Sequence, residues 1–190
     1  MPKIVDVQQY RQELLGKCFN LFAQKGYANV TTRQIAQELK VSTGTLYHYF
    51  SNKQVLFEQL VEYVSLRDVD LLKNIDKDRS IVQRLYALGR LLIEEKEYII
   101  KQTAIWLDFR QHSASQIDKN IVFWQAEQRY QQAIAQLLDL EDLQIAKFIW
   151  ASIDGICLDQ IDNHDSSAFD IQIELLVEML IAYFEKYNLV

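Results

Sequence analysis

Residues 43–48 of this 190-residue chain include four hydrogen-bonding side chains and no acid. Thr43 and Thr45 carry small hydroxyl groups, Tyr47 carries a phenol and His48 carries an imidazole. These groups can approach and hydrogen-bond both phosphates and the edges of nucleic-acid bases. The segment therefore predicts a surface that binds nucleic acid.

Two cations support the same interpretation. Arg33 and Lys53 lie in the first turns of predicted helices, where unpaired backbone amides and the helix dipole favour a phosphate. The chain has a net charge of −6, but residues 1–60 hold seven Lys or Arg and four Asp or Glu, a net of +3, so the rest carries −9. A basic N-terminal part joined to an acidic remainder indicates two modules with different partners.

The sequence lacks the motifs of common enzymes: it has no glycine-rich phosphate loop, no G-x-S-x-G elbow and no H-E-x-x-H pair. No catalytic residue, metal ligand or cofactor is therefore predicted, and the chain is not expected to be an enzyme. His164 lies close to Asp159, Asp162 and Asp165, but such residues collect routinely where a helix runs into a polar loop.

Cysteine usage and hydropathy predict the compartment. Cys18 and Cys157 are far apart and match no disulfide framework or metal spacing, which fits a reducing cytoplasm. The N-terminus lacks the apolar core of a secretory signal, and no apolar run approaches the roughly 18 residues that a membrane-spanning helix needs. We expect a soluble cytoplasmic protein that does not contact a membrane.

The elements that must position these residues are all predicted to be helices, because the only proline is Pro2. Pairs of a capping residue with a Gln three positions later predict helix starts at Asp6, Thr31 and Ser51, and Ser42 predicts a further start. Gly26 is expected to end the first helix. Periodicity predicts later helices at 53–74, 80–95, 97–112, 117–138, 141–162 and 168–187. Polar breaks are expected at 77–78, 113–115, 139–141 and 163–167.

Only Lys40 and Val41 separate the two short helices that follow Thr31 and Ser42. This arrangement predicts a helix-turn-helix, in which the second helix commonly enters the DNA major groove. Leu46 and Phe50, four residues apart, are expected to face the core.

The stretch from Thr31 to Phe57 reads TTRQIAQELKVSTGTLYHYFSNKQVLF, and it resembles the DNA-binding domain of TetR-family transcriptional regulators. The resemblance implies an all-α fold of about nine helices, with a DNA-binding domain at residues 1–52 and an effector-binding and dimerisation domain at 53–190. It implies DNA contacts by Thr32, Arg33, Ser42, Thr43, Gly44, Thr45, Tyr47, His48, Tyr49 and Lys53.

Within that set the resemblance assigns Thr32 and Arg33 to the DNA backbone. Thr43, Thr45 and His48 are assigned to bases. Family members often carry Lys or Arg at the first of these positions. Because this chain has Thr43 there, a weaker DNA contact is expected.

The remaining assignments concern phosphates and close approach. Tyr47 and Lys53 match phosphate-binding positions, Gly44 lets its helix come close to DNA, and Tyr49 contacts either backbone or base. Ser42 is expected to act mainly as a helix cap.

The last two predicted helices carry more apolar surface than a peripheral helix needs. In the TetR family the corresponding helices pair into a four-helix dimer interface, and the stretch from Trp150 to Gly155 resembles part of it. The expected interface residues are Ile149, Ile153, Gly155, Ile156, Leu175, Met179 and Leu180. A two-fold dimer presents two recognition helices to a palindromic site.

A dense set of aromatic residues in the middle of the chain suggests either core packing or an effector cavity. Asp108 is considered as a polar anchor for an effector. The residues expected to bind an effector are Arg90, Trp106, Phe109, His112, Trp124 and Phe148.

The sequence thus predicts a homodimeric repressor that a small molecule of unknown identity releases from double-stranded operator DNA. Control by a protein partner or a co-repressor stays open. The alternative from another class is a small helical enzyme or ligand carrier, for which no paired catalytic residues are found.

Overall fold

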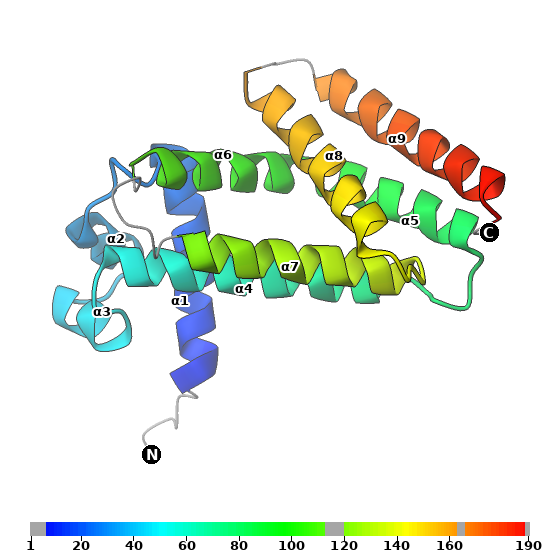
Figure 1. Cartoon of the computed structure of the whole chain (residues 1–190). Coiled ribbons are helices and arrows are strands. Elements are labelled where there is room, and N and C mark those ends of the chain that lie inside the picture. The colour runs from blue at the N-terminus through cyan, green and yellow to red at the C-terminus, as the bar shows by residue number, and fades with distance from the viewer. Residues whose placement is uncertain (1–6, 113–119, 163–165, 189–190) are drawn as a thin grey trace. The chain divides into compact units, whose positions relative to one another are not determined.

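A computed structural model describes residues 7–112, 120–162 and 166–188, and all regular structure within these ranges is helical (Figure 1). The described ranges contain nine helices, which are α1 (Val7–Lys25), α2 (Thr32–Glu38), α3 (Thr43–Tyr49), α4 (Lys53–Lys73), α5 (Ile81–Glu94), α6 (Lys96–His112), α7 (Asn120–Leu137), α8 (Leu143–Asp162) and α9 (Ser166–Lys186). The all-α prediction is confirmed, and the six later helices begin and end within three residues of their predicted bounds.

Local capping explains several of these boundaries. Thr31 and Gln34 form the predicted capping box at α2, and Ser42 caps α3. Ser80 forms the same box with Gln83 at the start of α5.

The cap of α4 differs from the prediction at Ser51. The backbone N–H of Val55 donates to Asn52 Oδ1 at 2.9 Å, so the cap lies one residue later. Asn is as good a cap as Ser, and the predicted partner Gln54 donates to Glu58 instead. The predicted cap at Asp6, the break at 113–115 and the residues at 163–165 lie outside the described residues.

The chain divides into two compact units. Unit 1 takes in the described residues of 1–66 and 105–126, and unit 2 those of 67–104 and 127–190. This division differs from the expected boundary after residue 52, because the first half of α4 packs into unit 1, where Leu56, Phe57 and Leu60 are buried. Helices α4, α6 and α7 each contribute residues to both units.

Aromatic side chains from α1, α4, α6 and α7 make the core of unit 1. Phe57 stacks on Phe109 with ring centroids 4.4 Å apart and meets Phe22 edge-on at 5.2 Å. Phe123 lies 5.5 Å from Phe109. These contacts join α1, α6 and α7 to the N-terminal part of α4.

The core of unit 2 is built where α9 packs against α5 and α8 (Figure 1). Phe169, Ile173 and Phe184 of α9 are fully buried there. Gly89 permits the close approach of α5 and α9, because a Cβ at that position would lie 2.8 Å from Val177 Cγ2.

Candidate nucleic-acid interface and effector-binding region

Helices α2 and α3 form the helix-turn-helix that the sequence predicted. Lys40 has φ of 55° in the turn, and the N–H of Val41 donates to Ala36 O at 3.0 Å, which ends α2 and redirects the chain into α3. Leu46 and Phe50 are each 1% exposed and attach α3 to unit 1.

The opposite side of α3 is open to solvent. Thr43, Gly44, Thr45 and His48 are exposed, and Tyr47 is 53% exposed although it is a large aromatic residue. An exposed row of hydroxyl, phenol and imidazole groups can donate to or accept from DNA.

Ser42 and Thr45 are tied together at the start of this face. The N–H of Thr45 donates to Ser42 Oγ at 2.9 Å, and the two hydroxyl oxygens lie 2.8 Å apart. Ser42 therefore caps α3 as expected. Tyr49 is half-buried, and its ring lies 5.4 Å from that of Tyr10 and 5.2 Å from that of His48.

The predicted contacts on α2 lie at its start. Thr32, its first residue, is half-buried, and Arg33 is exposed. Both side chains sit in the first turn, the end of a helix that favours an anion.

Lys53 has a different environment from the one expected for a phosphate contact. Its ammonium group donates to Tyr27 O and Val30 O, both at 2.9 Å, and lies 4.2 Å from the centroid of the Tyr27 ring. Burial lowers the pKa of Lys53, and the nearby carboxylate of Asp108 opposes that shift. In this structure the half-buried Lys53 side chain braces the α1–α2 turn, residues 26–30.

Asp108 of α6 holds the same turn through the backbone N–H groups of the turn. Its carboxylate accepts from the N–H groups of Tyr27 and Ala28, the latter at 3.2 Å. Gly26 has φ of 75°, and a Cβ there would lie 3.0 Å from Asp108 Oδ2. His112 Nδ1 lies 3.0 Å from Asp108 Oδ1. Asp108 thus supports the DNA-binding unit, a role that the sequence did not indicate.

The residues expected to bind an effector are not gathered in one unit. Phe109 is buried in the core of unit 1, Trp106 is half-buried beside Phe57, and Trp124 is 60% exposed. His112 is exposed and also belongs to unit 1.

The other two expected effector residues belong to unit 2 and lie on its surface. Arg90 is exposed on α5, beside Tyr86 and Gln83. Phe148 is 62% exposed and lines a groove on the outside of α8 and α9. Phe148 is therefore corrected to this groove, because helical periodicity does not reveal which face of α8 is covered.

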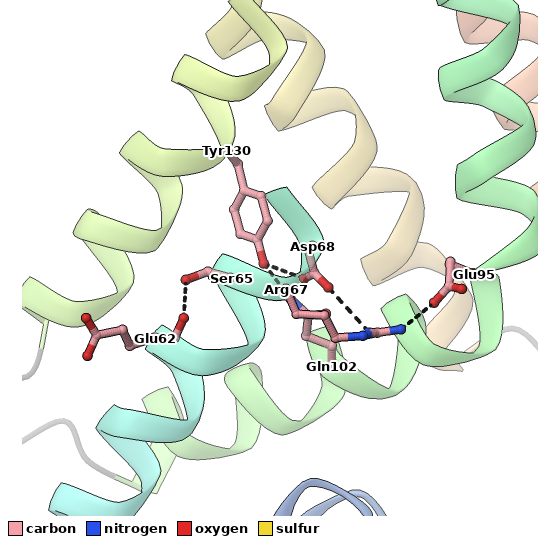
Figure 2. Close-up of polar contacts among 7 residues, drawn as sticks. All are labelled: Glu62, Ser65, Arg67, Asp68, Glu95, Gln102 and Tyr130. Carbon is pink, nitrogen blue, oxygen red and sulfur yellow. Dashed lines mark hydrogen bonds and ion pairs between the residues drawn. The ribbon is translucent and has the colours of Figure 1, made fainter. Parts of the chain in front are cut away.

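A buried polar cluster in unit 2 was not predicted (Figure 2). We call Arg67, Asp68, Glu95, Gln102 and Tyr130 the Asp68 cluster. Tyr130 Oη donates to Asp68 Oδ2 at 2.7 Å, and Gln102 Nε2 donates to Tyr130 Oη at 2.9 Å. Arg67 bonds Glu95 at 2.9 Å and lies 3.5 Å from Asp68. No sequence motif marks this set, since its members come from α4, α6, α7 and the residue before α6.

The electrostatics of the Asp68 cluster are unusual for a protein interior. Burial raises the pKa of Asp68 to about 6, although the hydrogen bond from Tyr130 and the charge of Arg67 act in the opposite direction. The carboxylate is therefore ionised at neutral pH in a poorly solvated place, which is a common property of functional sites.

The groove on α8 and α9 has a volume of about 720 Å³ and a mostly apolar lining that includes Phe148, Ile156 and Tyr183. Ile171, Leu175, Met179 and Tyr183 of α9, and Tyr187 directly after it, recur every fourth residue and are 43–61% exposed. A continuous exposed apolar row of this size is typical of an interface.

The expected interface residues divide into two groups. Leu175, Met179, Ile156 and Leu180 line the groove, although Leu180 is only 5% exposed and also belongs to the core of unit 2. Gly155 is exposed, and a Cβ at that position would have nothing within 4 Å, which leaves room for a partner helix.

Ile149 and Ile153 are corrected to the core of unit 2, since they are 0% and 5% exposed. They lie on the inner face of α8, so a partner molecule cannot reach them.

The fold and the exposed face of α3 define a helix-turn-helix protein with a second helical unit. Residues 14–60 match the family described as bacterial regulatory proteins, tetR family. These residues belong to that family, and the resemblance seen in the sequence is confirmed.

Curated relatives and solved structures that are similar to this chain are also transcriptional regulators. The uncharacterised HTH-type transcriptional regulator YvkB of Bacillus subtilis is 31% identical over 127 residues, 67% of this chain and 62% of YvkB. The HTH-type transcriptional repressor KstR2 of Mycobacterium tuberculosis is 29% identical over 116 residues, 58% of this chain and 56% of KstR2. The chain thus spans less than two thirds of the length of either relative.

The fold matches that of a solved transcriptional regulator, FadR from Bacillus subtilis in complex with stearoyl-CoA. The TM-score is 0.71 at 18% identity, and the match covers 90% of this chain and 97% of FadR. In the described part of the chain, no helix is both long and apolar enough to cross a membrane.

Proposed function

We propose that this chain is a homodimeric transcriptional repressor that covers a palindromic operator and leaves it when a small molecule binds unit 2. The observation that carries the proposal is the solvent-exposed face of α3, from Thr43 to His48, within a segment that matches the tetR family. The proposed compartment is the cytoplasm, where such a regulator reaches DNA.

Repression and release by a ligand are supported by similar proteins. KstR2 is named a repressor, and the solved FadR contains stearoyl-CoA. The physical requirement is that the effector binds one conformation of the dimer more tightly than the other. Helices α4, α6 and α7 contribute to both units, so a change within unit 2 can shift the helix-turn-helix.

The second copy of the chain is proposed to cover the groove on α8 and α9. Its apolar row is self-complementary under two-fold symmetry, because the same α9 residues from each copy can pack together. A dimer also explains why a short recognition helix suffices, since two half-sites add their binding free energies.

The test is a selection of bound duplexes from random double-stranded DNA, followed by fluorescence anisotropy at two salt concentrations. We expect a palindromic consensus, binding that weakens with salt, and loss of specific binding in the Tyr47→Ala, His48→Ala double variant. The matched control is Tyr86→Ala, which removes a tyrosine of similar exposure, 45%, from unit 2.

Recovery of no consensus, or equal affinity for unrelated DNA, would overturn the proposal. A consensus bound only after a protein partner or small molecule is added would replace release by an effector with control by that partner or by a co-repressor.

A further inference from the structure

The Asp68 cluster has an excess of negative charge. Asp68 and Glu95 contribute two carboxylates, whereas Arg67 contributes one guanidinium group. That guanidinium group bonds Glu95 at 2.9 Å and lies over the Tyr98 ring at 4.0 Å, and its distance to Asp68 is longer, 3.5 Å. Asp68 is thus only partly neutralised within its own cluster.

Gln102 Oε1 is a hydrogen-bond acceptor in the same cluster that lacks a donor among the described residues. The side chain is buried, with 6% of the residue exposed, and Oε1 has no hydrogen-bond partner among the described residues. The orientation of the amide follows from its neighbours: the Tyr130 hydroxyl hydrogen is given to Asp68, so the Tyr130 oxygen must accept from Gln102 Nε2. An unpaired buried acceptor is unfavourable and calls for a donor.

Tyr130 links the cluster to a pair of stacked aromatic rings. The Tyr130 ring stacks on Trp150 with centroids 4.3 Å apart and planes within 8°. Aromatic faces attract cations as well as apolar groups. The outer part of the cluster is open to solvent, because the side chains of Asp68, Glu95 and Arg67 are 18%, 31% and 35% exposed, whereas Gln102 Oε1 is buried.

We propose that the Asp68 cluster binds the protonated amino group of a small effector, with Asp68 and Gln102 Oε1 accepting its N–H bonds and Trp150 covering its apolar part. An ammonium group satisfies both observations, since it supplies the missing positive charge and the missing donor. A carboxylate or a phosphate supplies neither and is repelled. The inference rests on the proposed function, in which unit 2 holds the effector.

The test uses three probes of different size, namely 2-phenylethylammonium, 2-(indol-3-yl)ethylammonium and hexylammonium. Each is compared with its alcohol and with the matching carboxylate, by calorimetry and by the shift in melting temperature of the full chain. We expect an ammonium probe to bind and its alcohol and carboxylate to bind at least about tenfold more weakly.

Two variants locate the site. Asp68→Asn and Gln102→Met should each weaken the ammonium probe by about tenfold or more. Asp70→Asn is the matched control, because it makes the same change two residues along α4 on a side chain that is 69% exposed. Its affinity for the probe should equal that of the natural chain.

Equal affinity for ammonium and alcohol, unchanged binding in Asp68→Asn, or tighter binding of the carboxylate or of stearoyl-CoA would each overturn the proposal. So would the absence of binding by all three ammonium probes. The DNA selection is measured separately on the same preparations, so failure of the amine site leaves a palindromic consensus intact, and failure of the regulator proposal removes it.

Discussion

At the scale of single residues, several side chains are placed where they lower stability, which indicates a role outside folding. Tyr47 exposes an aromatic ring to solvent, Gly44 lies inside a short helix, and Asp68 carries a charge into a poorly solvated region. These three residues lie on the two surfaces that we propose to bind DNA or effector.

Gly44 tests the close approach of α3 to DNA. A Cβ at Gly44 would meet Ser42 Oγ at 3.6 Å, an ordinary contact, so Gly44→Ala should raise the free energy of unfolding by up to about 1 kcal/mol through helix propensity. The added methyl group should nevertheless lower operator affinity by about tenfold. Gly16→Ala, whose Cβ would lie 3.6 Å from Tyr63 Oη, controls for the gain in propensity. Full operator affinity in Gly44→Ala would rule out a tight approach there.

The raised pKa of Asp68 predicts how the free energy of unfolding depends on pH. Its pKa is raised from 3.8 to about 6 in the folded chain, so the folded state takes up this proton before the unfolded state does. The unfavourable contribution of the carboxylate is therefore absent below about pH 4, grows between pH 4 and 6, and is complete above pH 6.

Asp68→Asn should accordingly raise the free energy of urea unfolding by about 1 to 3 kcal/mol at pH 7.5 and have little effect at pH 4. Asn keeps an acceptor for Tyr130 and can donate to Gln102 Oε1. Asp70→Asn should show no such pH dependence. A destabilised Asp68→Asn at pH 7.5 would mean that the carboxylate contributes to folding.

At the scale of elements, the α1–α2 turn is held from two helices that are distant in sequence. Lys53 of α4 binds its carbonyl groups, and Asp108 of α6 binds its amide groups. Because α2 begins directly after this turn, a displacement of α4 or α6 is transmitted to the first turn of α2. In this structure Lys53 positions the helix-turn-helix, and the phosphate contact expected for it stays a prediction.

Asp108→Ala should loosen this turn. Two backbone N–H groups lose their acceptor, which should lower the free energy of unfolding by about 1 to 3 kcal/mol and speed hydrogen exchange at the amides of Tyr27 and Ala28. Operator affinity should fall as well. Asp76→Ala, at a side chain that is 58% exposed, is the control. Unchanged exchange at Tyr27 and Ala28 would show that the turn does not depend on Asp108.

At the scale of the whole molecule, α9 has two apolar faces. Phe169, Ile173 and Phe184 are buried in unit 2, whereas Leu175 and Met179 are 58% and 59% exposed. A helix that is apolar on both sides is typical of an interface, and in the proposed dimer the second copy would supply matching residues.

The double variant Leu175→Glu, Met179→Glu should convert the dimer to a monomer, measured by sedimentation velocity. Four like charges would meet across the two-fold axis, while both positions are exposed within one chain, so the fold should persist by circular dichroism. Affinity for a palindromic operator should fall by about a hundredfold or more. Ile121→Glu, 53% exposed on α7, should leave the dimer intact. A dimer that survives the double variant would place the interface elsewhere.

The helices, the caps at Thr31 and Ser42, and the exposed face of α3 could all be predicted from the sequence. These features depend on contacts between residues three or four positions apart, which the order of residues sets directly. Capping preference did not fix the start of α4, because Ser51 and Asn52 are equally good caps. The prediction chose Ser51, whereas Asn52 caps the helix.

The covered face of each helix and the contacts between distant groups could not be predicted in this way, because they depend on how the helices pack. Lys53 lies 26 residues from Tyr27, Tyr130 lies 62 residues from Asp68, and Asp108 lies 81 residues from Tyr27. Periodicity marked Ile149, Ile153 and Phe148 as apolar positions, but the packing of α9 determined that the first two are buried and the third faces outward. Side chains at such separations meet only because helix packing brings them together, and no local pattern encodes that arrangement.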